Sequence, residues 1–185
     1  MMQVMNDKLT QYELRKRAGR IKLLLTDNDG VLTDAGVYYS GTGEEMKRFS
    51  VRDGMGVERL QMHRIQTAII TGENSDSVLR RAEKLQLRHI YLGIRDKYSH
   101  LQTILHETGI TIKEIAYIGD DVLDLEIIRE ISIHGLTAAP SDAMREIRDL
   151  VHFRCVLPGG HGAFREFAEW ILGLRNTIWL NEPPI

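Results

Sequence analysis

Residues 23–34 constrain the fold more than any other stretch, because there an apolar run ends in two closely spaced acids and a glycine. The leucines at 23–25 lack polar alternation, which predicts a strand buried on both faces. Asp27 and Asp29 follow, and side chains two residues apart along a strand point the same way. Two such carboxylates repel each other unless a cation lies between them. The pattern therefore predicts a cation site or, as the simpler alternative, an Asp-rich turn at Gly30.

The length and composition narrow the class of protein. A chain of 185 residues is the usual size of one α/β domain. Its net charge of −2 argues against nucleic acid or an anionic membrane as the main partner. The single cysteine, Cys155, suits a reducing compartment, and the first residues lack the layout of a signal peptide. We therefore expect a cytoplasmic protein.

Strand-like and helix-like segments alternate along the chain. Such alternation predicts an α/β fold, with a Rossmann-like parallel sheet sandwiched by helices. Two β-prone runs with a Gly-rich turn between them predict a hairpin over 35–51. The other predicted strands lie near 23–25, 66–71, 90–93, 114–119, 132–138 and 151–156. The predicted helices lie near 7–18, 53–64 (with Asp53 as a possible cap), 75–85, 96–108, 124 onward, 141–149 and 163–174.

Polar side chains follow several predicted strands at their carboxyl ends, where ligands bind in open parallel sheets. Asp27 and Asp29 follow the first strand, Thr71-Gly72 the next, and Gly119-Asp120-Asp121 a third, while Lys97 begins a helix. Carboxylate oxygens suit Mg²⁺, and a hydroxyl, an amide and an ammonium suit a phosphate. Taken singly, each residue is more simply a surface lysine, a strand-end hydroxyl or a helix-start acid. Together they favour phosphoryl transfer.

The ordered set Asp27-x-Asp29, Thr71-Gly72, Lys97 and Gly119-Asp120-Asp121-x-x-Asp124 resembles the motifs of the haloacid-dehalogenase-like phosphohydrolases. The resemblance covers residues 21–172. It implies that Asp27 is a nucleophile forming an aspartyl-phosphate. It also implies that Asp29 protonates the leaving alkoxide and then activates water.

The same resemblance assigns the remaining motif residues. Asp27, the backbone carbonyl of Asp29, and Asp120 would hold Mg²⁺. Thr71, Gly72 and Lys97 would bind the phosphoryl oxygens. Asp121 and Asp124 would support the site, with Asp124 orienting Lys97 or the metal shell. Asn28 stands where the family usually has an apolar residue, and strand alternation predicts that its side chain points away from the site.

The spacing between the motifs leaves room for the hairpin but for no cap domain. The resemblance thus implies a helical extension at 1–20, a catalytic domain at 21–175 and an extended tail at 176–185. A site without a cap is open to water, so neighbouring subunits are the natural source of its walls. An isolated hairpin is marginal by itself, so we expect it to pair with other hairpins in an oligomer.

Among the capless members, the chain looks similar to the 3-deoxy-manno-octulosonate 8-phosphate phosphatases, which are tetrameric, require Mg²⁺ and serve lipopolysaccharide sugar synthesis. The matching segments are Phe49–Gly54, Ile70–Gly72, Arg81-Ala82, Asp96-Lys97, Ala116–Asp121 and Gly159–Glu166. The implied substrate contacts are Ser50, Val51, Arg52, Asp53, Gly54 and Arg81. The alternative for Arg52-Asp53-Gly54 is a helix cap with a nearby cation. The alternative for Gly159-Gly160 is a plain loop rather than a segment that helps close a site.

Two positions depart from that pattern, because Glu73 and Glu58 stand where it has basic residues. Replacing a cation by a carboxylate reverses the local charge, so that an attraction for the acid group of the substrate becomes a repulsion. Thr-Gly-Glu instead resembles phosphatases of nine-carbon keto-sugar acid 9-phosphates, which adds Glu73 to the expected substrate contacts. The substrate is thus an eight- or nine-carbon sugar-acid phosphate. The alternatives are a broad-range phosphatase and a non-catalytic sugar-phosphate-binding partner of a cytidylyltransferase, against which the intact Asp29 argues.

Overall fold

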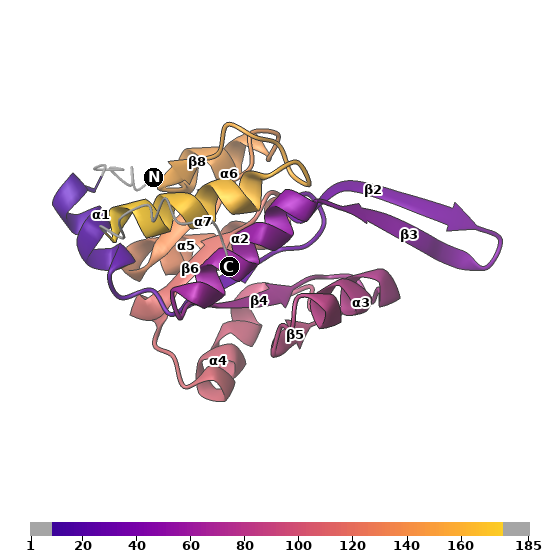
Figure 1. The fold of residues 1–185 in the computed structure, drawn as a ribbon, viewed down its shortest axis with the longest axis horizontal. Helices are drawn as coiled ribbons and strands as arrows, with labels where there is room; N and C mark the ends of the chain where they lie inside the picture. The colour runs from indigo at the N-terminus through magenta and orange to yellow at the C-terminus, as the bar shows by residue number, and fades with distance from the viewer. Residues whose placement is uncertain (1–8, 176–185) are drawn as a thin grey trace, which may run out of the picture.

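A computed structural model describes residues 9–175 of the chain. Its central layer is a six-stranded sheet in the order β5-β4-β1-β6-β7-β8 with every pairing parallel (Figure 1). The strands are β1 (Leu23–Thr26), β4 (Gln66–Ile70), β5 (His89–Tyr91), β6 (Ile115–Ile118), β7 (Leu136–Ala139) and β8 (Phe153–Arg154). This sheet and its flanking helices confirm the predicted Rossmann-like α/β fold.

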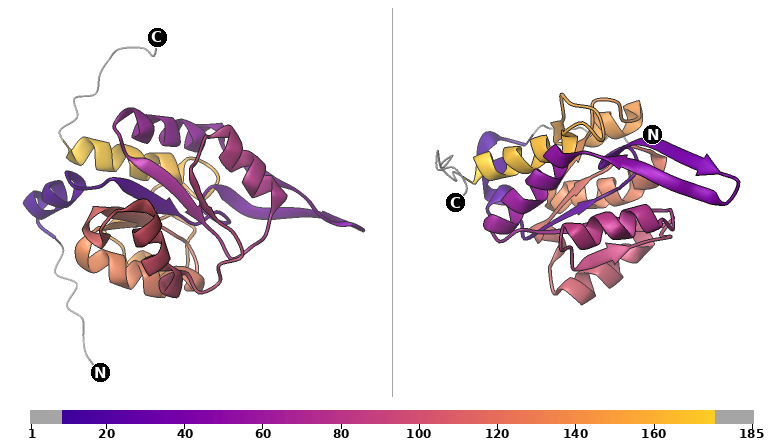
Figure 2. Two further views of the ribbon diagram at one scale, coloured as in Figure 1. Left: turned by 90° about the horizontal axis from the view of Figure 1, so that it is seen from below. Right: turned by 45° about the vertical axis from the view of Figure 1, so that its right-hand side comes forward.

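Helices cover both faces of the sheet, so the molecule has three layers (Figures 1 and 2). The helices of one face are α1 (Gln11–Ala18), α2 (Val51–Met62), α3 (Asp76–Lys84) and α7 (Ala163–Leu174). Those of the other face are α4 (Lys97–Thr108), α5 (Leu125–His134) and α6 (Arg145–Leu150). Between β1 and α2 the chain forms only a hairpin, and between β4 and α4 only α3 and β5, so the described residues contain no inserted cap domain.

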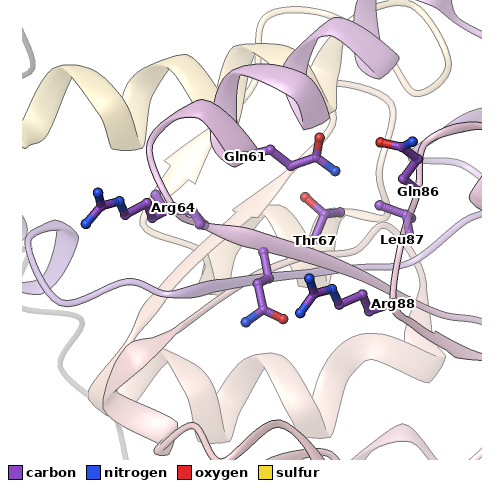
Figure 3. A pocket seen from close by; sticks show the side chains of 8 residues that line it. Gln61, Arg64, Thr67, Gln86, Leu87 and Arg88 are labelled. Carbon is purple, nitrogen blue, oxygen red and sulfur yellow. The ribbon is translucent and has the colours of Figure 1, made fainter.

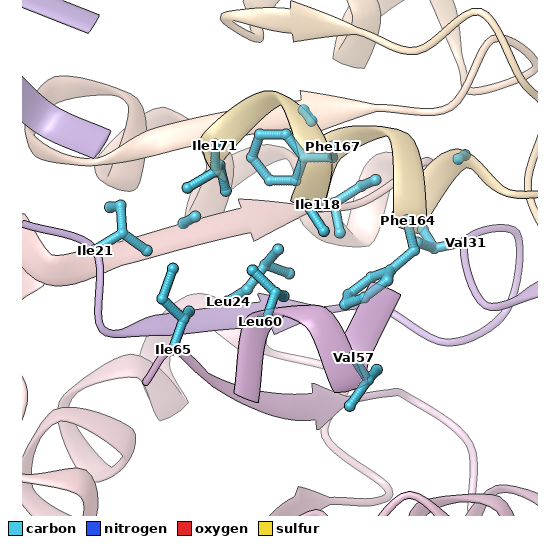
Figure 4. Close-up of a cluster of buried hydrophobic side chains, with 14 of the residues drawn as sticks. Ile21, Leu24, Val31, Val57, Leu60, Ile65, Ile118, Phe164, Phe167 and Ile171 are labelled. Atoms are coloured by element: carbon cyan, nitrogen blue, oxygen red, sulfur yellow. The ribbon is translucent and has the colours of Figure 1, made fainter. Parts of the chain in front are cut away.

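The first strand shows why its sequence is apolar without alternation. Leu24 belongs to the core cluster under α2 and α7, whereas Leu23 and Leu25 belong to the cluster under α4 and α5. Figure 4 shows the first cluster, in which Leu60 of α2 and Phe164 of α7 extend toward the sheet. Each side chain of β1 is therefore buried, whichever face it occupies.

The predicted strand near 132–138 is wrong at its beginning. Helix α5 continues to His134, and β7 begins only at Leu136. The spacing of Ile127, Ile128 and Ile131, all buried, keeps this segment helical. Gly135 makes the change of direction possible, since a Cβ there would lie 2.0 Å from the carbonyl oxygen of Ile115 in β6.

The hairpin consists of β2 (Thr33–Ser40) and β3 (Gly43–Phe49), and it extends away from the body of the molecule (Figure 1). Its outer part exposes Tyr38, Tyr39 and Met46.

At the other end of the fold, α1 begins with a capping box formed by Thr10 and Glu13. The first residues of the predicted extension and the predicted tail at 176–185 lie outside the described residues. No helix within residues 9–175 has the length and apolar character needed to cross a membrane.

Candidate active site

The carboxyl ends of three neighbouring strands bring the predicted motif residues to one edge of the sheet. Asp27 follows β1, and its N–H donates to the carbonyl of Ile118 at the end of β6. Asp120 comes two residues after that carbonyl. Thr71 follows β4 on the other side of β1, and its N–H donates to the carbonyl of Tyr91 in β5. Chain segments far apart in sequence thus meet as predicted for an open parallel sheet.

A buried lysine connects two of the acids. Lys97 is the first residue of α4 and is 2% exposed. Its Nζ lies 2.8 Å from Oδ1 of Asp27 and 2.6 Å from Oδ1 of Asp124. Burial by itself would lower the pKa of Lys97, but Asp27 and Asp124 outweigh that effect and raise it. The ammonium therefore stays charged beside the carboxylate of Asp27.

Asp124 holds the loop after β6 in place. It is fully buried and accepts hydrogen bonds from Lys97 Nζ at 2.6 Å and from the Tyr117 hydroxyl at 2.5 Å. Its other oxygen accepts from the backbone N–H groups of Asp120 at 2.9 Å and Asp121 at 3.2 Å. Tyr117 lies in the matching segment Ala116–Asp121 but was not predicted as a site residue, because a tyrosine within an apolar strand usually signals only a core position. The exposed side chain of Asp121 accepts from the N–H of Val122.

The acids at this edge form a candidate metal centre. Carboxylate oxygens of Asp27, Asp120 and Asp124 lie within 4.8 Å of one another. Burial raises the pKa of Asp27 and of Asp120, and so does repulsion by a neighbouring acid, which is Asp124 for Asp27 and chiefly Asp27 for Asp120. Oδ1 of Asp120 is buried and has no hydrogen-bond partner among the described residues. Because both oxygens of Asp124 already accept hydrogen bonds, Asp27 and Asp120 are the carboxylates that best fit a hard cation such as Mg²⁺.

Asp29 has a different set of partners. Its Oδ2 lies 2.7 Å from Nζ of Lys47 in β3, while its Oδ1 accepts from Asn28 Nδ2 at 3.0 Å and Thr33 Oγ1 at 3.2 Å. The prediction that Asn28 points away from the site is wrong. Since β1 ends at Thr26, strand alternation no longer governs residues 27–29. Lys47 was missed, because nothing in the sequence places the hairpin over Asp29.

Several predicted substrate contacts hold the start of α2 in this structure. Ser50, rather than Asp53, is the N-cap of α2. The carboxylate of Asp53 accepts from the N–H groups of Gly162 and Arg165, each at 3.1 Å, and so ties α2 to α7. Nη2 of Arg81 donates to the carbonyl of Ser50 at 2.8 Å. Asp53 therefore does not cap α2, as the alternative interpretation expected, although a cation, Arg81, does lie beside the start of this helix.

The remaining predicted contacts differ in exposure. A Cβ on Gly54 would lie 2.6 Å from Nη2 of Arg81, so this glycine lets the guanidinium pack against α2. The side chains of Val51, Arg52 and Glu73 are exposed, whereas Thr71 is buried and its Oγ1 accepts from the N–H of Glu73. Direct contact of these residues with a substrate stays a prediction.

The glycine-rich loop before α7 packs against the first motif. The N–H of Gly160 donates to the carbonyl of Val31, and a Cβ on Gly159 would lie 1.9 Å from the carbonyl oxygen of Gly30. The loop therefore packs against the segment that carries Asp27 and Asp29. The alternative interpretation, a plain loop, included no such contact.

A hollow of about 480 Å³ lies away from these acids (Figure 3). It is at the amino end of β4, whereas Thr71 follows the carboxyl end. Its lining residues are Gln61, Arg64, Ile65, Gln66, Thr67, Gln86, Leu87 and Arg88. Because no carboxylate lines it, this hollow lacks the chemistry of the acid cluster.

Known proteins are similar to this chain in sequence and in fold. A 3-deoxy-D-manno-octulosonate 8-phosphate phosphatase from Yersinia pestis is 37% identical over 157 residues, which cover 85% of this chain and 82% of the relative. The structure of a phosphatase of that name from Moraxella catarrhalis, in complex with magnesium ion, phosphate ion and a KDO molecule, is 37% identical. Its TM-score is 0.83, and the match covers 90% of this chain and 94% of that chain.

A cobalt-bound phosphatase of the same kind from Haemophilus influenzae is 35% identical, with a TM-score of 0.81 over 86% of this chain and 91% of that chain. No protein-family model matches the sequence. The fold and the acid cluster are those of a haloacid-dehalogenase-like phosphohydrolase. At these identities and coverages, the chain belongs to the family of the 3-deoxy-D-manno-octulosonate 8-phosphate phosphatases, which confirms the resemblance and the prediction of a phosphoric monoester hydrolase.

Proposed function

We propose that this phosphatase hydrolyses the phosphate monoester of an acidic keto-sugar, with 3-deoxy-manno-octulosonate 8-phosphate or a nine-carbon analogue as substrate. The observation that carries the proposal is the placement of Asp27 at the end of β1. Its carboxylate contacts the ammonium of Lys97 and lies within the acid cluster that includes Asp120. A nucleophile, a phosphate-binding cation and metal-binding oxygens thus share one edge of the sheet.

In this proposal a carboxylate oxygen of Asp27 attacks phosphorus, and the bond from phosphorus to the sugar oxygen breaks. Asp29 donates a proton to the departing alkoxide, and then accepts a proton from the water that hydrolyses the aspartyl-phosphate. Thr71, the amide of Gly72, and Lys97 bind the phosphoryl oxygens. Mg²⁺, held by Asp27, Asp120 and the backbone carbonyl of Asp29, would supply neutralisation of phosphate charge.

The identity of the sugar rests on Glu73. Its side chain is exposed directly after Thr71-Gly72, so it can accept hydrogen bonds from the hydroxyls of a bound sugar. A carboxylate there disfavours a second anionic group close by. In a nine-carbon substrate, one more carbon separates the phosphate from the sugar carboxylate. That carboxylate can then stay further from Glu73, and for this reason the nine-carbon analogue is the second candidate substrate.

The proposal extends to the setting of the reaction. We place the enzyme in the cytosol, in the synthesis of sugars for bacterial surface polysaccharides, as a homotetramer. The relatives named for the 8-phosphate of 3-deoxy-D-manno-octulosonate support the substrate class. A broad-range phosphatase is the competing function, and turnover of a panel of substrates separates the two. The phosphatase relatives argue against the non-catalytic partner of a cytidylyltransferase.

The test is phosphate release from the eight-carbon 8-phosphate, a nine-carbon 9-phosphate and simple sugar phosphates, each with Mg²⁺. We expect turnover of a keto-sugar acid phosphate well above that of the simple sugars, silencing by EDTA and recovery with Mg²⁺. Asp27→Asn removes the nucleophile and should abolish turnover while leaving the circular dichroism spectrum unchanged. Activity above a few per cent in Asp27→Asn, or full activity in chelator, would contradict the proposed chemistry.

A further inference from the structure

The hairpin contributes a buried cation to the proposed active site. The side chain of Lys47 in β3 is 1% exposed, although most of the hairpin is solvated. Its Nζ lies 2.7 Å from Oδ2 of Asp29 and 3.6 Å from Oε2 of Glu44. Burying an ammonium is costly unless it is well paired. Lysines on surface strands usually keep their ammonium in water. The burial of the Lys47 ammonium against Asp29 therefore indicates a role at the site.

Lys47 completes a set of donors that holds the carboxylate of Asp29 at both oxygens. Oδ1 accepts from Asn28 Nδ2 and Thr33 Oγ1, and Oδ2 accepts from Lys47 Nζ. Thr33 begins β2 and Lys47 belongs to β3, so two of these three donors come from the hairpin. Donors on both oxygens fix the plane of the carboxylate, and thereby the direction of the remaining lone pair on Oδ2.

The network continues from the hairpin to the start of α3. Glu44 accepts a hydrogen bond from Ser75 Oγ at 2.5 Å, and Ser75 is the N-cap of α3. That helix begins just after the phosphate-binding segment Thr71-Gly72. The chain of contacts Asp29–Lys47–Glu44–Ser75 therefore connects the position of the hairpin with the orientation of Asp29.

We propose that Lys47 is a positioning residue that aims Asp29 at the water attacking the aspartyl-phosphate. This inference rests on the proposed function of Asp29. In the step concerned, the water oxygen bonds to phosphorus, its proton passes to Asp29, and the bond from phosphorus to Asp27 breaks. Inorganic phosphate leaves, and the carboxylate of Asp27 is regenerated. A general base needs an aligned lone pair, and the contact with Lys47 supplies that alignment.

Lys47→Met tests the proposal, because methionine keeps most of the side-chain volume and removes the ammonium. The substrate is p-nitrophenyl phosphate, whose nitrophenolate leaves without a proton, so formation of the aspartyl-phosphate does not depend on Asp29. Rapid quench with acid gives separate rate constants for formation and hydrolysis of the phosphoenzyme. We expect formation to change by less than about threefold and hydrolysis to slow by roughly 10- to 100-fold, so that the phosphorylated form accumulates.

Three variants complete the experiment. Asp29→Asn should show the same accumulation more strongly, and Lys47→Arg should recover part of the hydrolysis rate. Arg48→Met is the matched control, because Arg48 is the next residue of β3 but contacts Asp34, Gly160 and His161 instead of Asp29. It should leave the ratio of the two rate constants as in the wild type. Circular dichroism and light scattering establish that each variant keeps its fold and assembly.

The possible outcomes separate the two levels of inference. If Lys47→Met lowers formation and hydrolysis equally, while Asp29→Asn accumulates the phosphoenzyme, Lys47 has only a structural role and this inference is overturned. If Asp29→Asn also fails to slow hydrolysis selectively, the role of Asp29 in the proposed function is overturned as well. Selective slowing in both variants, with Arg48→Met unchanged, supports the positioning role.

Discussion

The carboxylate of Asp120 packs directly against the backbone of Gly30. A Cβ at Gly30 would lie 2.0 Å from Oδ2 of Asp120, and the backbone there has a φ of +86°, which glycine adopts without strain. The glycine of the first motif thus leaves space for an acid that comes 90 residues later in the sequence. A side chain at this position would displace a carboxylate of the candidate metal centre.

Gly30→Ala should therefore lower kcat/KM by roughly 100-fold or more, because small displacements of reacting groups are costly. Gly109→Ala is the matched control, since Gly109 also has a positive φ, of +65°, but a Cβ there has no heavy atom within 4 Å. The control should lose about 1–2 kcal/mol of stability from backbone strain and keep its activity. Kinetics and thermal melts of both variants check this. Equal losses of activity would show that the contact with Asp120 is unimportant.

Glu73 provides a second prediction at the level of residues, and it concerns specificity. We expect Glu73→Arg to shift the ratio of kcat/KM values toward the eight-carbon 8-phosphate, because an arginine can pair with the acid group of the shorter substrate. A charged hydrogen bond contributes about 1.5–3 kcal/mol, so the shift should be roughly tenfold or more. Assays of both substrates on both proteins measure it. A ratio that stays within about twofold would remove Glu73 from the set of substrate contacts.

Among the secondary-structure elements, strand β7 contacts a half-buried histidine. Nδ1 of His152 accepts hydrogen bonds from the N–H of Thr137 at 3.1 Å and from its hydroxyl at 2.9 Å. Burial, together with the charge of Arg17, lowers the pKa of His152 from 6.5 to about 4. Protonation of Nδ1 would remove an acceptor from the backbone of β7.

This arrangement predicts a pH-dependent stability. The unfolded chain protonates His152 as the pH falls below about 6.5, whereas the folded protein resists protonation until about pH 4. The free energy of unfolding should therefore decrease over this range, by about 1–2 kcal/mol between pH 7 and pH 5. His152→Asn keeps an acceptor near the Nδ1 position and cannot titrate, so its stability should fall less. Urea unfolding of the wild type and of His152→Asn at pH 7 and pH 5 measures this difference. Equal losses of unfolding free energy in the two proteins would show that His152 is not responsible.

At the scale of the whole molecule, two features point to assembly: the extended hairpin and the lack of a cap domain within residues 9–175. Tyr38, Tyr39 and Met46 of the hairpin are 61%, 70% and 57% exposed, an apolar surface that a second copy of the chain could cover. An active site without a cap also needs walls from elsewhere. The predicted tetramer therefore concerns the active site as well as the oligomeric state, because neighbouring subunits would supply its missing walls.

Light scattering should show a tetramer. The double variant Tyr38→Glu/Tyr39→Glu should dissociate and lose activity, because it places charges on the surface predicted to be buried. Tyr12→Glu is a matched control, since Tyr12 lies on α1 and is 74% exposed. It should leave assembly and activity intact. A stable and fully active monomer of the wild type would exclude the tetramer as a requirement for catalysis.

The sequence by itself determined the fold class and the edge of the sheet where the acids lie. The apolar run at 23–25 predicted a strand buried on both faces, and polar residues that follow parallel strands were expected to meet at one edge of the sheet. The order of the motifs identified Asp27, Lys97 and Asp120 before any contact was known. The first two inferences rest on local periodicity and on chain topology. The roles of the three residues rest on the resemblance of the ordered motifs to those of the haloacid-dehalogenase-like phosphohydrolases.

Only the tertiary structure decided which side chains support those acids. The contact between Asp29 and Lys47 spans 18 positions, and that between Asp53 and Gly162 spans 109. The local sequence around a lysine in a hairpin, or around an aspartate near a helix start, does not reveal whether that side chain is solvated or buried. Their roles depend on where the hairpin and the loop before α7 fold back. Burial and charge pairing at those places are properties of the packed molecule, which local periodicity does not encode.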